Sequence, residues 1–255
     1  MGVEPQRVAV VTGAGSGIGR AIALALSRGG AAVALMGRTR SMLEAVAAQA
    51  PGPTCVVPAD VADRGAVDRA FDRAAGELGP LDVVVANAGI GGPNGTGAQD
   101  RWDAIVRTNL DGTYFCFRAF ERNLSPAAGW KHAIAISSCV ARFGVPGISA
   151  YSAAKAGQLG LVRSLAVEWA SKRILVNAIC PGWVETEMAV ERMTGIGREA
   201  GQSYEEARAA ELAAVPLQRI STPEEIAGVV DFLLSPAAVA FTGQAFDPNN
   251  GAWMG

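Results

Sequence analysis

Short apolar runs alternate with longer amphipathic stretches along most of the chain. The apolar runs cover residues 8–11, 32–36, 54–58, 81–85, 133–136 and 174–179. Runs of this length, bounded by turn residues, are typical of buried strands. The stretches between them, at 20–28, 41–50 and 66–78, have the spacing of amphipathic helices. Strands that alternate with helices indicate an α/β fold with a parallel sheet and right-handed crossovers.

Residues 99–123 are predicted to form one long helix, with apolar positions at Trp102, Ile105, Val106, Leu110, Phe115 and Phe117. Asn109 lies inside this helix. Because Asn is a weak helix former, its position indicates a turn, a local distortion or a polar role.

Composition narrows the class of protein. Half of the 255 residues are hydrophobic and 18% are charged, which argues against disorder. The net charge is -2 without a basic cluster, so we expect neither a nucleic acid nor an acidic membrane surface as partner. No apolar run reaches the roughly 20 residues of a membrane span. The segment from Met1 to Arg7 contains Pro5 and is too short for a signal peptide. We expect one domain over residues 1–255.

The cysteines and the single histidine limit the chemistry further. Cys55, Cys116, Cys139 and Cys180 are widely spaced, which matches neither a disulfide framework nor a zinc site. His132 is the only histidine, so most His-based metal or triad chemistry is excluded. These features predict a cytoplasmic protein without a metal.

Tyr151 and Lys155 are the strongest candidates for chemistry. They are four residues apart at the start of a predicted helix, so both side chains lie on one face. An ammonium beside a phenol favours the phenolate and lowers the tyrosine pKa, which suits a general acid or base. The alternative is an ordinary Tyr and Lys pair at the end of a surface helix.

Farther along the same predicted helix, Ala153, Ala156, Gly157 and Gly160 form a small, flat face that suits another helix, including one from a second subunit.

A glycine-rich segment follows the first predicted strand and precedes a helix. Three of its glycines, Gly13, Gly17 and Gly19, permit a tight turn and a close backbone approach. The N–H groups at a helix N-terminus bind phosphate, so the order of strand, loop and helix favours a dinucleotide site. The alternative is a glycine-rich turn without a ligand.

The second predicted strand ends in Gly37, Arg38 and Thr39, with no acidic residue. A carboxylate there would repel a 2′-phosphate, whereas an arginine can pair with one. Arg38 therefore favours NADP over NAD, unless it is an ordinary loop arginine. Asp60 and Asn87 follow neighbouring strands, at the sheet edge where open α/β sheets bind ligands.

The connection from Thr186 to Pro216 is long enough to be a lid over a site. Met188 to Gly197 mixes apolar residues with glycines. Ser203, with Glu206 three residues later, predicts the capped start of an exposed helix.

Taken together, the motifs resemble the short-chain dehydrogenase/reductase family over essentially the whole chain. They are Thr12-Gly-x-x-x-Gly-Ile-Gly19, Asn87-Ala-Gly89, Asn109, Ser138, Tyr151-x-x-x-Lys155, and Pro181-Gly182 followed by Thr186 and Met188. The resemblance implies a Rossmann-type doubly wound parallel sheet, with helices on both faces and a helical substrate lid at about 186–216, before the last strand. It implies hydride transfer between a nicotinamide and a carbonyl/alcohol pair.

The resemblance also implies roles for single residues. Tyr151 would donate the proton in reduction, and Lys155 would lower its pKa and hold the nicotinamide ribose. Ser138 would bind the substrate oxygen, and Asn109 would position a water that links Lys155 to solvent. The candidate cofactor site consists of Thr12, Gly13, Gly15, Ser16, Gly17, Ile18, Gly19, Arg38, Thr39, Asp60, Val61, Asn87, Ala88, Gly89, Tyr151, Lys155, Pro181, Gly182, Val184, Thr186 and Met188.

The expected substrate site lies between the lid and the loops after Gly89 and Ser138. Its candidate residues are mostly apolar, which favours a bulky or acyl-chain substrate: Ile90, Ser138, Val140, Phe143, Val145, Tyr151, Trp183, Met188 and Met193. The long lid resembles that of bacterial polyketide ketoreductases and β-ketoacyl thioester reductases. Arg142 or Arg192 would meet a CoA or phosphopantetheine phosphate, or would be solvated at the surface.

The leading hypothesis is therefore NADPH-dependent reduction of a ketone, in particular a 3-oxoacyl thioester or a polyketide. The alternatives are a catabolic NAD(P)-dependent secondary-alcohol dehydrogenase and a non-enzymatic dinucleotide sensor. The family habit and the flat helix face imply a homotetramer. The chain departs from the family at its end, which reads Asp247-Pro-Asn-Asn-Gly251, and this puts the C-terminal packing in question.

Overall fold

The computed structural model describes residues 6–255 and is built on a seven-stranded parallel sheet in the order β3-β2-β1-β4-β5-β6-β7. The expectation that Met1 to Arg7 is too short for a signal peptide concerns mainly residues 1–5, which lie outside the described residues. The strands are β1 (Val8–Thr12), β2 (Ala32–Gly37), β3 (Thr54–Pro58), β4 (Val83–Ala86), β5 (Lys131–Ile136), β6 (Ile174–Ile179) and β7 (Ala245–Phe246). The predicted strands are thus confirmed. The seventh strand, β7, has only two residues, too few to produce a period in the sequence.

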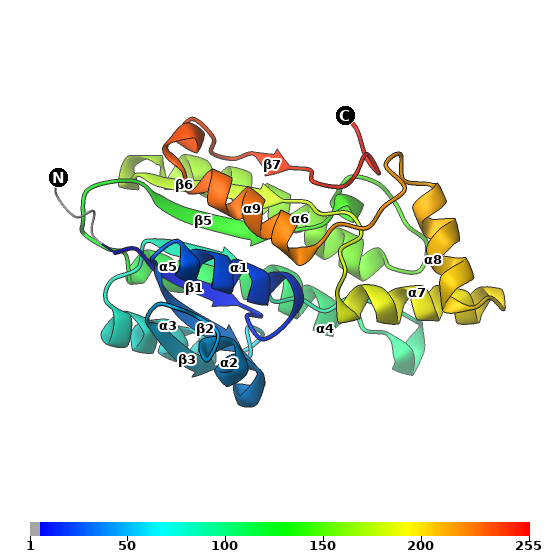
Figure 1. Ribbon diagram of the computed structural model, residues 1–255, viewed down its shortest axis with the longest axis horizontal. Coiled ribbons are helices and arrows are strands. Elements are labelled where there is room, and N and C mark those ends of the chain that lie inside the picture. The colour runs from blue at the N-terminus through cyan, green and yellow to red at the C-terminus, as the bar shows by residue number, and fades with distance from the viewer. Residues whose placement is uncertain (1–5) are drawn as a thin grey trace.

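Helices cover both faces of this sheet, as Figure 1 shows. They are α1 (Gly17–Arg28), α2 (Arg40–Ala47), α3 (Arg64–Leu78), α4 (Trp102–Val106), α5 (Gly112–Arg122), α6 (Ser149–Glu168), α7 (Glu187–Ala200), α8 (Tyr204–Ala213) and α9 (Pro223–Leu233). One apolar core lies between the sheet and α1, α2 and α9, and a second lies between the sheet and α3, α5 and α6. The arrangement confirms the doubly wound α/β fold expected from the alternation of strands and helices.

The predicted helix 99–123 is interrupted, which corrects its boundaries. A short turn η1 (Gly97–Gln99) precedes α4, and a π-helical turn η2 (Arg107–Asp111) separates α4 from α5. Asn109 lies in η2, and its side-chain amide donates to Ile105 O at 2.8 Å and to Ile90 O at 2.9 Å. The distortion expected at Asn109 is therefore present, and its amide satisfies two carbonyl groups.

Helices α7 and α8 project beyond the ends toward which the strand arrows point (Figure 1). Thr186 caps α7 by accepting the N–H of Ala189 at 3.3 Å. The expected capping box of Ser203 and Glu206 starts α8. A Cβ on Gly197 would lie 2.9 Å from Gln202 O, so a glycine permits the close approach of the two helices. The lid is helical, as expected.

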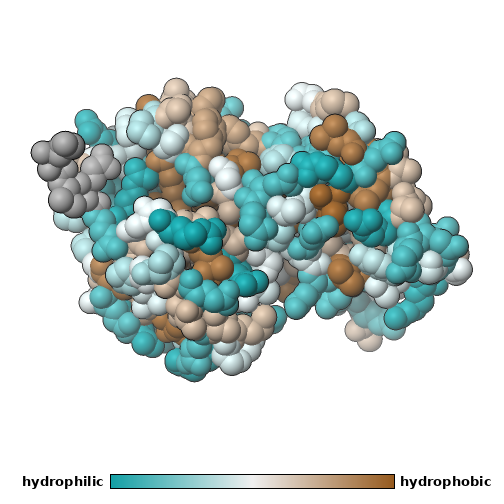
Figure 2. Space-filling view, viewed as in Figure 1, coloured by the Kyte–Doolittle hydropathy of each residue, from teal (hydrophilic) through white to brown (hydrophobic). Residues whose placement is uncertain are grey.

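The surface of this lid region is partly apolar. In the space-filling view, hydrophobic residues interrupt the hydrophilic surface on the side where α7, α8 and the C-terminal end lie (Figure 2). Met188, Val190 and Leu217 are among the exposed apolar side chains of this region. Within residues 6–255, none of the helices has the length and apolar character required to cross a membrane.

Candidate active site

The glycine-rich loop between β1 and α1 has a backbone that only glycine adopts readily. Gly13 and Gly17 have φ angles of 64° and 50°. A Cβ on Gly13 would lie 2.8 Å from Asn87 Nδ2, and a Cβ on Gly19 would collide with the Gly13 carbonyl oxygen. The loop is therefore a cradle that side chains would fill.

The end of β4 holds this loop in place. Thr12 Oγ1 accepts the N–H groups of Asn87 and Ala88 at 3.0 and 2.9 Å. The Asn87 amide donates to Thr12 O at 2.9 Å and to Gly13 O at 3.4 Å. Asn87 thus anchors the cradle through its side chain.

The N-terminus of α1 suits an anion. Ser16 is its N-cap residue, is exposed, and makes no side-chain cap bond, while the first turn has no acidic residue. The first N–H groups of the helix are therefore free to bind a phosphate. Thr186 Cγ2 would be 3.0 Å from a Cβ on Gly17, so the start of the lid borders the same cradle. These residues fit a dinucleotide pyrophosphate, with Gly15 and Ile18 lining the turn.

Arg38 and Thr39 are exposed between β2 and α2, next to the glycine loop. Ala14 donates its N–H to Met36 O at 3.1 Å, and a Cβ on Gly15 would lie 3.0 Å from Met42 Cβ. The first turn of α2 has no acidic residue. No carboxylate of the first turn of α2 therefore competes for the Arg38 guanidinium at the edge of the cradle.

Asp60 and Val61 follow β3 at the same end of the sheet. The Asp60 carboxylate accepts the N–H of Ala62 at 2.9 Å and is exposed, whereas Val61 is buried against Gly112. Among the cofactor candidates near the sixth strand, Pro181 and Val184 are also buried, and Val184 forms an isolated bridge with Ser221.

Tyr151 and Lys155 lie together on α6, as the spacing predicts. The Lys155 Nζ atom is 5.5 Å from the centroid of the Tyr151 ring and donates to Ile136 O at 2.7 Å. Burial lowers the pKa of Lys155 to about 8, so its ammonium form persists at neutral pH.

The predicted direction of the Tyr151 pKa shift is corrected by the structure. Burial raises the pKa of Tyr151 to about 12, and hydrogen bonding with Ser138 opposes the shift without reversing it. The reason is that a phenolate enclosed by the protein loses its hydration, and this loss is the largest influence on the pKa of Tyr151. At neutral pH Tyr151 is therefore a protonated phenol.

Asn109 is fully buried beside this pair. Gln158 on α6 donates to Asn109 O at 2.8 Å and to Thr113 Oγ1 at 2.7 Å, and Thr113 donates to Asn109 O at 2.7 Å. Asn109 Oδ1 is buried and has no hydrogen-bond partner among residues 6–255. A Cβ on Gly89 would lie 2.5 Å from this oxygen and 3.6 Å from Lys155 Nζ. The structure thus brings Gly89, Asn109 and Lys155 together, as the sequence predicts.

The substrate side of Tyr151 is bordered by the lid and by a glycine that sequence reasoning missed. A Cβ on Gly91 would lie 3.3 Å from Met188 Sδ and 4.0 Å from Tyr151 Cε2. Gly91 therefore faces the space between the lid and the phenol. Its place within a run of glycines after Gly89 is the only sequence signal that points to it.

The other predicted substrate residues differ in accessibility. Met188 and Phe143 are 42% and 37% exposed, while Ile90, Val140, Val145 and Trp183 are half-buried. Met193, in contrast, is fully buried and has no surface to offer a ligand. This corrects the expectation for Met193, which lies on the inward face of the amphipathic α7.

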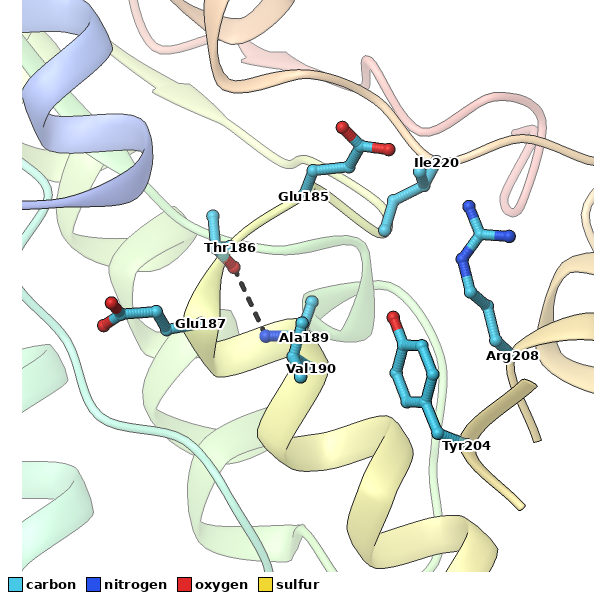
Figure 3. A pocket seen from close by; sticks show the side chains of 8 residues that line it. All are labelled: Glu185, Thr186, Glu187, Ala189, Val190, Tyr204, Arg208 and Ile220. Carbon is cyan, nitrogen blue, oxygen red and sulfur yellow. Dashed lines mark hydrogen bonds between the residues drawn. The ribbon is translucent and has the colours of Figure 1, made fainter. Parts of the chain in front are cut away.

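A pocket of about 330 Å³ lies between the starts of α7 and α8 (Figure 3). Thr186 and Val190 line one side, and Tyr204 and Arg208, which sequence reasoning missed, line the other. Tyr204 and Arg208 are four residues apart on the capped helix α8, and this spacing is the sequence signal that places both on one face of the helix. Because Thr186 also borders the glycine cradle, the pocket adjoins the cofactor side of the site.

Arg142, expected either to meet a phosphate or to be solvated at the surface, is paired with a carboxylate in this structure. Its guanidinium binds the Asp247 carboxylate at 2.9 Å and is therefore engaged by the C-terminal segment. Arg192 lies 4.0 Å from Glu199 on the lid.

Comparison with known proteins agrees with this geometry. A family model described as enoyl-(acyl carrier protein) reductase matches residues 13–252. A 3-oxoacyl-(acyl-carrier-protein) reductase of Pseudomonas aeruginosa is 37% identical over 97% of this chain and 98% of its own. A cis-4-hydroxycyclohexanecarboxylate dehydrogenase of Sinomonas cyclohexanicum is 38% identical over 91% of each chain.

The fold is also that of a solved ketoreductase. A variant of the actinorhodin polyketide ketoreductase, solved with NADPH, superposes with a TM-score of 0.88, with 32% identity and 99% of both chains covered. The sheet, the glycine cradle and the Tyr151 centre occur together with this similarity over nearly the whole length. The chain belongs to the short-chain dehydrogenase/reductase family, and it is an oxidoreductase of alcohol and ketone groups that uses a nicotinamide dinucleotide.

Proposed function

We propose that this protein is an NADPH-dependent carbonyl reductase that acts on a 3-oxoacyl thioester or a polyketide. The observation that carries the proposal is the proton donor at the sheet edge. Tyr151 is half-buried beside Ser138 and Lys155, and its pKa is raised to about 12, so it holds a proton at neutral pH. A protonated phenol suits reduction, where the alkoxide formed from the ketone needs a proton.

Each side chain has a separate task in this proposal. The Ser138 hydroxyl and the Tyr151 hydroxyl donate to the substrate oxygen, on which negative charge develops. Tyr151 then transfers its proton to that oxygen. The Lys155 ammonium stabilises the phenolate that remains, because opposite charges attract strongly in a buried site. The bound dinucleotide supplies the hydride.

The return of a proton to Tyr151 uses the buried polar group next to Lys155. The unpartnered Asn109 Oδ1 and Lys155 Nζ both lie beside Gly89, and a buried acceptor of this kind is a typical site for an ordered water. We infer that Asn109 holds a water that links Lys155 to solvent. Gln158 and Thr113 hold the π-helical turn that presents Asn109.

Arg38 supports NADPH over NADH as the cofactor. Its side chain is exposed at the end of β2, beside the glycine loop, and no acidic residue lies in the first turn of α2. A guanidinium there can bind a 2′-phosphate through two parallel hydrogen bonds. Thr12 and the glycines would hold the pyrophosphate, Asp60 and Val61 would border the adenine, and Thr186 would meet the nicotinamide side.

The substrate class is supported by the apolar wall and by the relatives. Met188 and Phe143 are exposed beside the Tyr151 and Ser138 segments, which suits an acyl chain or a polyketide. The reductase of Pseudomonas aeruginosa acts on a 3-oxoacyl group on a carrier protein, and the solved neighbour is a polyketide ketoreductase. A substrate linked to CoA or to an acyl carrier fits both.

A second candidate function is a catabolic NAD(P)-dependent secondary-alcohol dehydrogenase. The similarity to the dehydrogenase of Sinomonas cyclohexanicum favours it, because that relative is named for oxidation of a cyclic alcohol. The same residues serve both directions, with Tyr151 as base in oxidation. A non-enzymatic dinucleotide sensor is disfavoured, because it has no need for Tyr151, Lys155 and Ser138 together.

The assembly we propose is a homotetramer of single-domain subunits, each with a lid at about 186–216. Ala153, Ala156 and Gly160 are exposed on α6, so this small-residue face is available for close helix packing. Gly157 instead contacts Leu110 of its own chain. All four cysteines are buried and unpaired, which fits a reducing cytoplasm.

A cofactor titration tests the proposal. Initial rates are measured with NADPH and with NADH for the wild-type protein and for Arg38→Asp, using acetoacetyl-CoA and a bulky aromatic ketone. We expect NADPH preference, reversal of that preference by the substitution, and turnover of the thioester. NADH preference that does not depend on Arg38, with turnover of the aromatic ketone alone, would favour the catabolic dehydrogenase.

A further inference from the structure

The turn that carries Ser138 is fixed at two ends by different parts of the chain. At its start, Cys139 donates its N–H to Pro181 O at 2.9 Å. Within the turn η3 (Cys139–Ala141), the Ser138 carbonyl accepts the N–H of Ala141 at 3.0 Å. Arg142 ends this turn, so the positions of Ser138 and Arg142 are set together.

Arg142 is held by residues near the C-terminus. Its Nη2 and Nε atoms lie 2.9 and 3.3 Å from the two carboxylate oxygens of Asp247, an arrangement in which both oxygens are bound. Its guanidinium carbon lies 4.6 Å from the centroid of the Trp253 ring. The two charged side chains are 21% and 18% exposed, so water screens their attraction only partly. A planar guanidinium is required for both contacts.

The same C-terminal segment contacts two other borders of the site. Gly182 donates its N–H to Pro248 O at 3.4 Å, next to the expected nicotinamide side. Leu217 donates to Asn250 O at 3.2 Å, and Asn250 Nδ2 donates to Ser221 Oγ at 2.9 Å, where the lid returns to the sheet. Residues 247–253 therefore link the Ser138 turn, the Pro181–Gly182 turn and the end of the lid.

We propose that Arg142, Asp247 and Trp253 form a clamp that positions the Ser138 hydroxyl. The clamp rests on the proposed function, because Ser138 binds the substrate oxygen there. Arg142 and Asp247 act through Ser138 and are positioning residues. A small displacement of a hydroxyl that donates to the reacting oxygen weakens the hydrogen bond where charge develops.

A matched control distinguishes the clamp from an ion pair that only stabilises the fold. Asp82 and Lys131 form a similar pair, 2.9 Å apart, with side chains 13% and 6% exposed. They lie at the amino ends of β4 and β5, the opposite edge of the sheet from Ser138. Asp82→Asn therefore weakens a buried pair of the same kind at a distance from the chemistry.

The test is a double-mutant cycle with Asp247→Asn and Ser138→Ala, read with NADPH and acetoacetyl-CoA. Asp247→Asn is expected to lower kcat roughly tenfold in the wild-type background, because a displaced Ser138 hydroxyl stabilises the transition state less well. In the Ser138→Ala background the same substitution is expected to lower kcat less than about twofold, since coupled residues are not additive. The cofactor dissociation constant stays unchanged, and Asp82→Asn leaves kcat unchanged. If Asp247→Asn does not fold, Arg142→Lys takes its place in the cycle.

Amide hydrogen exchange provides a readout that does not need turnover. Asp247→Asn is expected to accelerate exchange in residues 138–143, whereas Asp82→Asn leaves that exchange unchanged. Equal losses of kcat in both backgrounds, or unchanged exchange in residues 138–143, would overturn the clamp. If the wild-type protein reduces no ketone with either cofactor, the proposed function fails, and the exchange measurement still decides whether the clamp holds the turn.

Discussion

The Lys155 ammonium lies 5.5 Å from the centroid of the Tyr151 ring, and its Nζ atom is bound to Ile136 O. The two side chains share one face of α6, yet burial has opposite effects on their proton affinities. It raises the pKa of Tyr151 to about 12 and lowers that of Lys155 to about 8. At neutral pH the pair is therefore a neutral phenol beside a cation, the state that proton donation to a ketone requires.

This relationship predicts the pH dependence of ketone reduction. Tyr151 keeps its proton well beyond neutral pH, so it does not limit the rate there. Lys155 loses its charge as the pH rises through about 8, and the phenolate is then less stabilised. The rate at saturating substrate should therefore be constant near neutral pH and fall above about pH 8. The measurement is kcat against pH, with Lys155→Met as control. A rate independent of pH through this range in the wild-type protein would contradict the assignment.

A methyl group on Gly19 should damage the cofactor site. Its Cβ would collide with Gly13 O and lie 2.5 Å from Asn87 Nδ2, so the glycine loop must shift. We expect Gly19→Ala to lower the free energy of unfolding by about 1–3 kcal/mol and to weaken cofactor binding. Urea unfolding and a cofactor fluorescence titration measure the two effects.

Gly76→Ala is the control for this substitution. Gly76 lies in α3, and a Cβ there meets no atom within 4 Å. Alanine at this helical position should stabilise the protein by up to about 1 kcal/mol and leave cofactor binding unchanged. Equal cofactor affinity in Gly19→Ala and Gly76→Ala would show that the loop does not hold the dinucleotide.

Substitution of Gly91 should change the choice of substrate. An added methyl group would lie 3.3 Å from Met188 Sδ and 4.0 Å from Tyr151 Cε2, which narrows the space between the lid and the phenol. For Gly91→Ala we expect KM to rise more for a bulky aromatic ketone than for acetoacetyl-CoA. In the double variant that also carries Met188→Ala, KM for the bulky ketone should return toward its wild-type value. An equal change of KM for both ketones would place Gly91 outside the substrate space.

The two methionines of the lid should behave differently. Met193 is fully buried, so Met193→Ala leaves a cavity and should lower the free energy of unfolding by about 2–5 kcal/mol. Met188 is 42% exposed, and Met188→Ala should change that free energy by less than about 0.5 kcal/mol while changing KM for the ketone. Urea unfolding and initial rates separate these effects. If the Met193→Ala variant is as stable as the wild-type protein and its KM is altered, Met193 contacts the substrate after all.

Local patterns made much of the fold and of the reaction centre predictable. The apolar runs located six strands, the glycine spacing located the cradle, and the spacing of four between Tyr151 and Lys155 placed both on one helical face. Each of these signals lies within one element and its neighbours. The weak helix propensity of Asn109 likewise indicated the distortion found at η2.

What the sequence could not provide depends on residues that meet across long stretches of chain. Arg142 and Asp247 are 105 positions apart, so no local pattern shows that Arg142 is engaged. The direction of the Tyr151 pKa shift depends on burial by the whole fold, which outweighs the hydrogen bond with Ser138. Met193 and Met188 look alike in sequence, and only the packing of α7 separates a core residue from an exposed one.

The central claim is that the Tyr151 phenol donates the proton in NADPH-dependent ketone reduction. The most direct measurement is the turnover of acetoacetyl-CoA by Tyr151→Phe, together with the NADPH dissociation constant of the variant. We predict that kcat falls by roughly 10²–10⁴-fold, because a positioned proton donor is lost, while the dissociation constant changes by less than about twofold. Wild-type turnover by Tyr151→Phe would contradict the account.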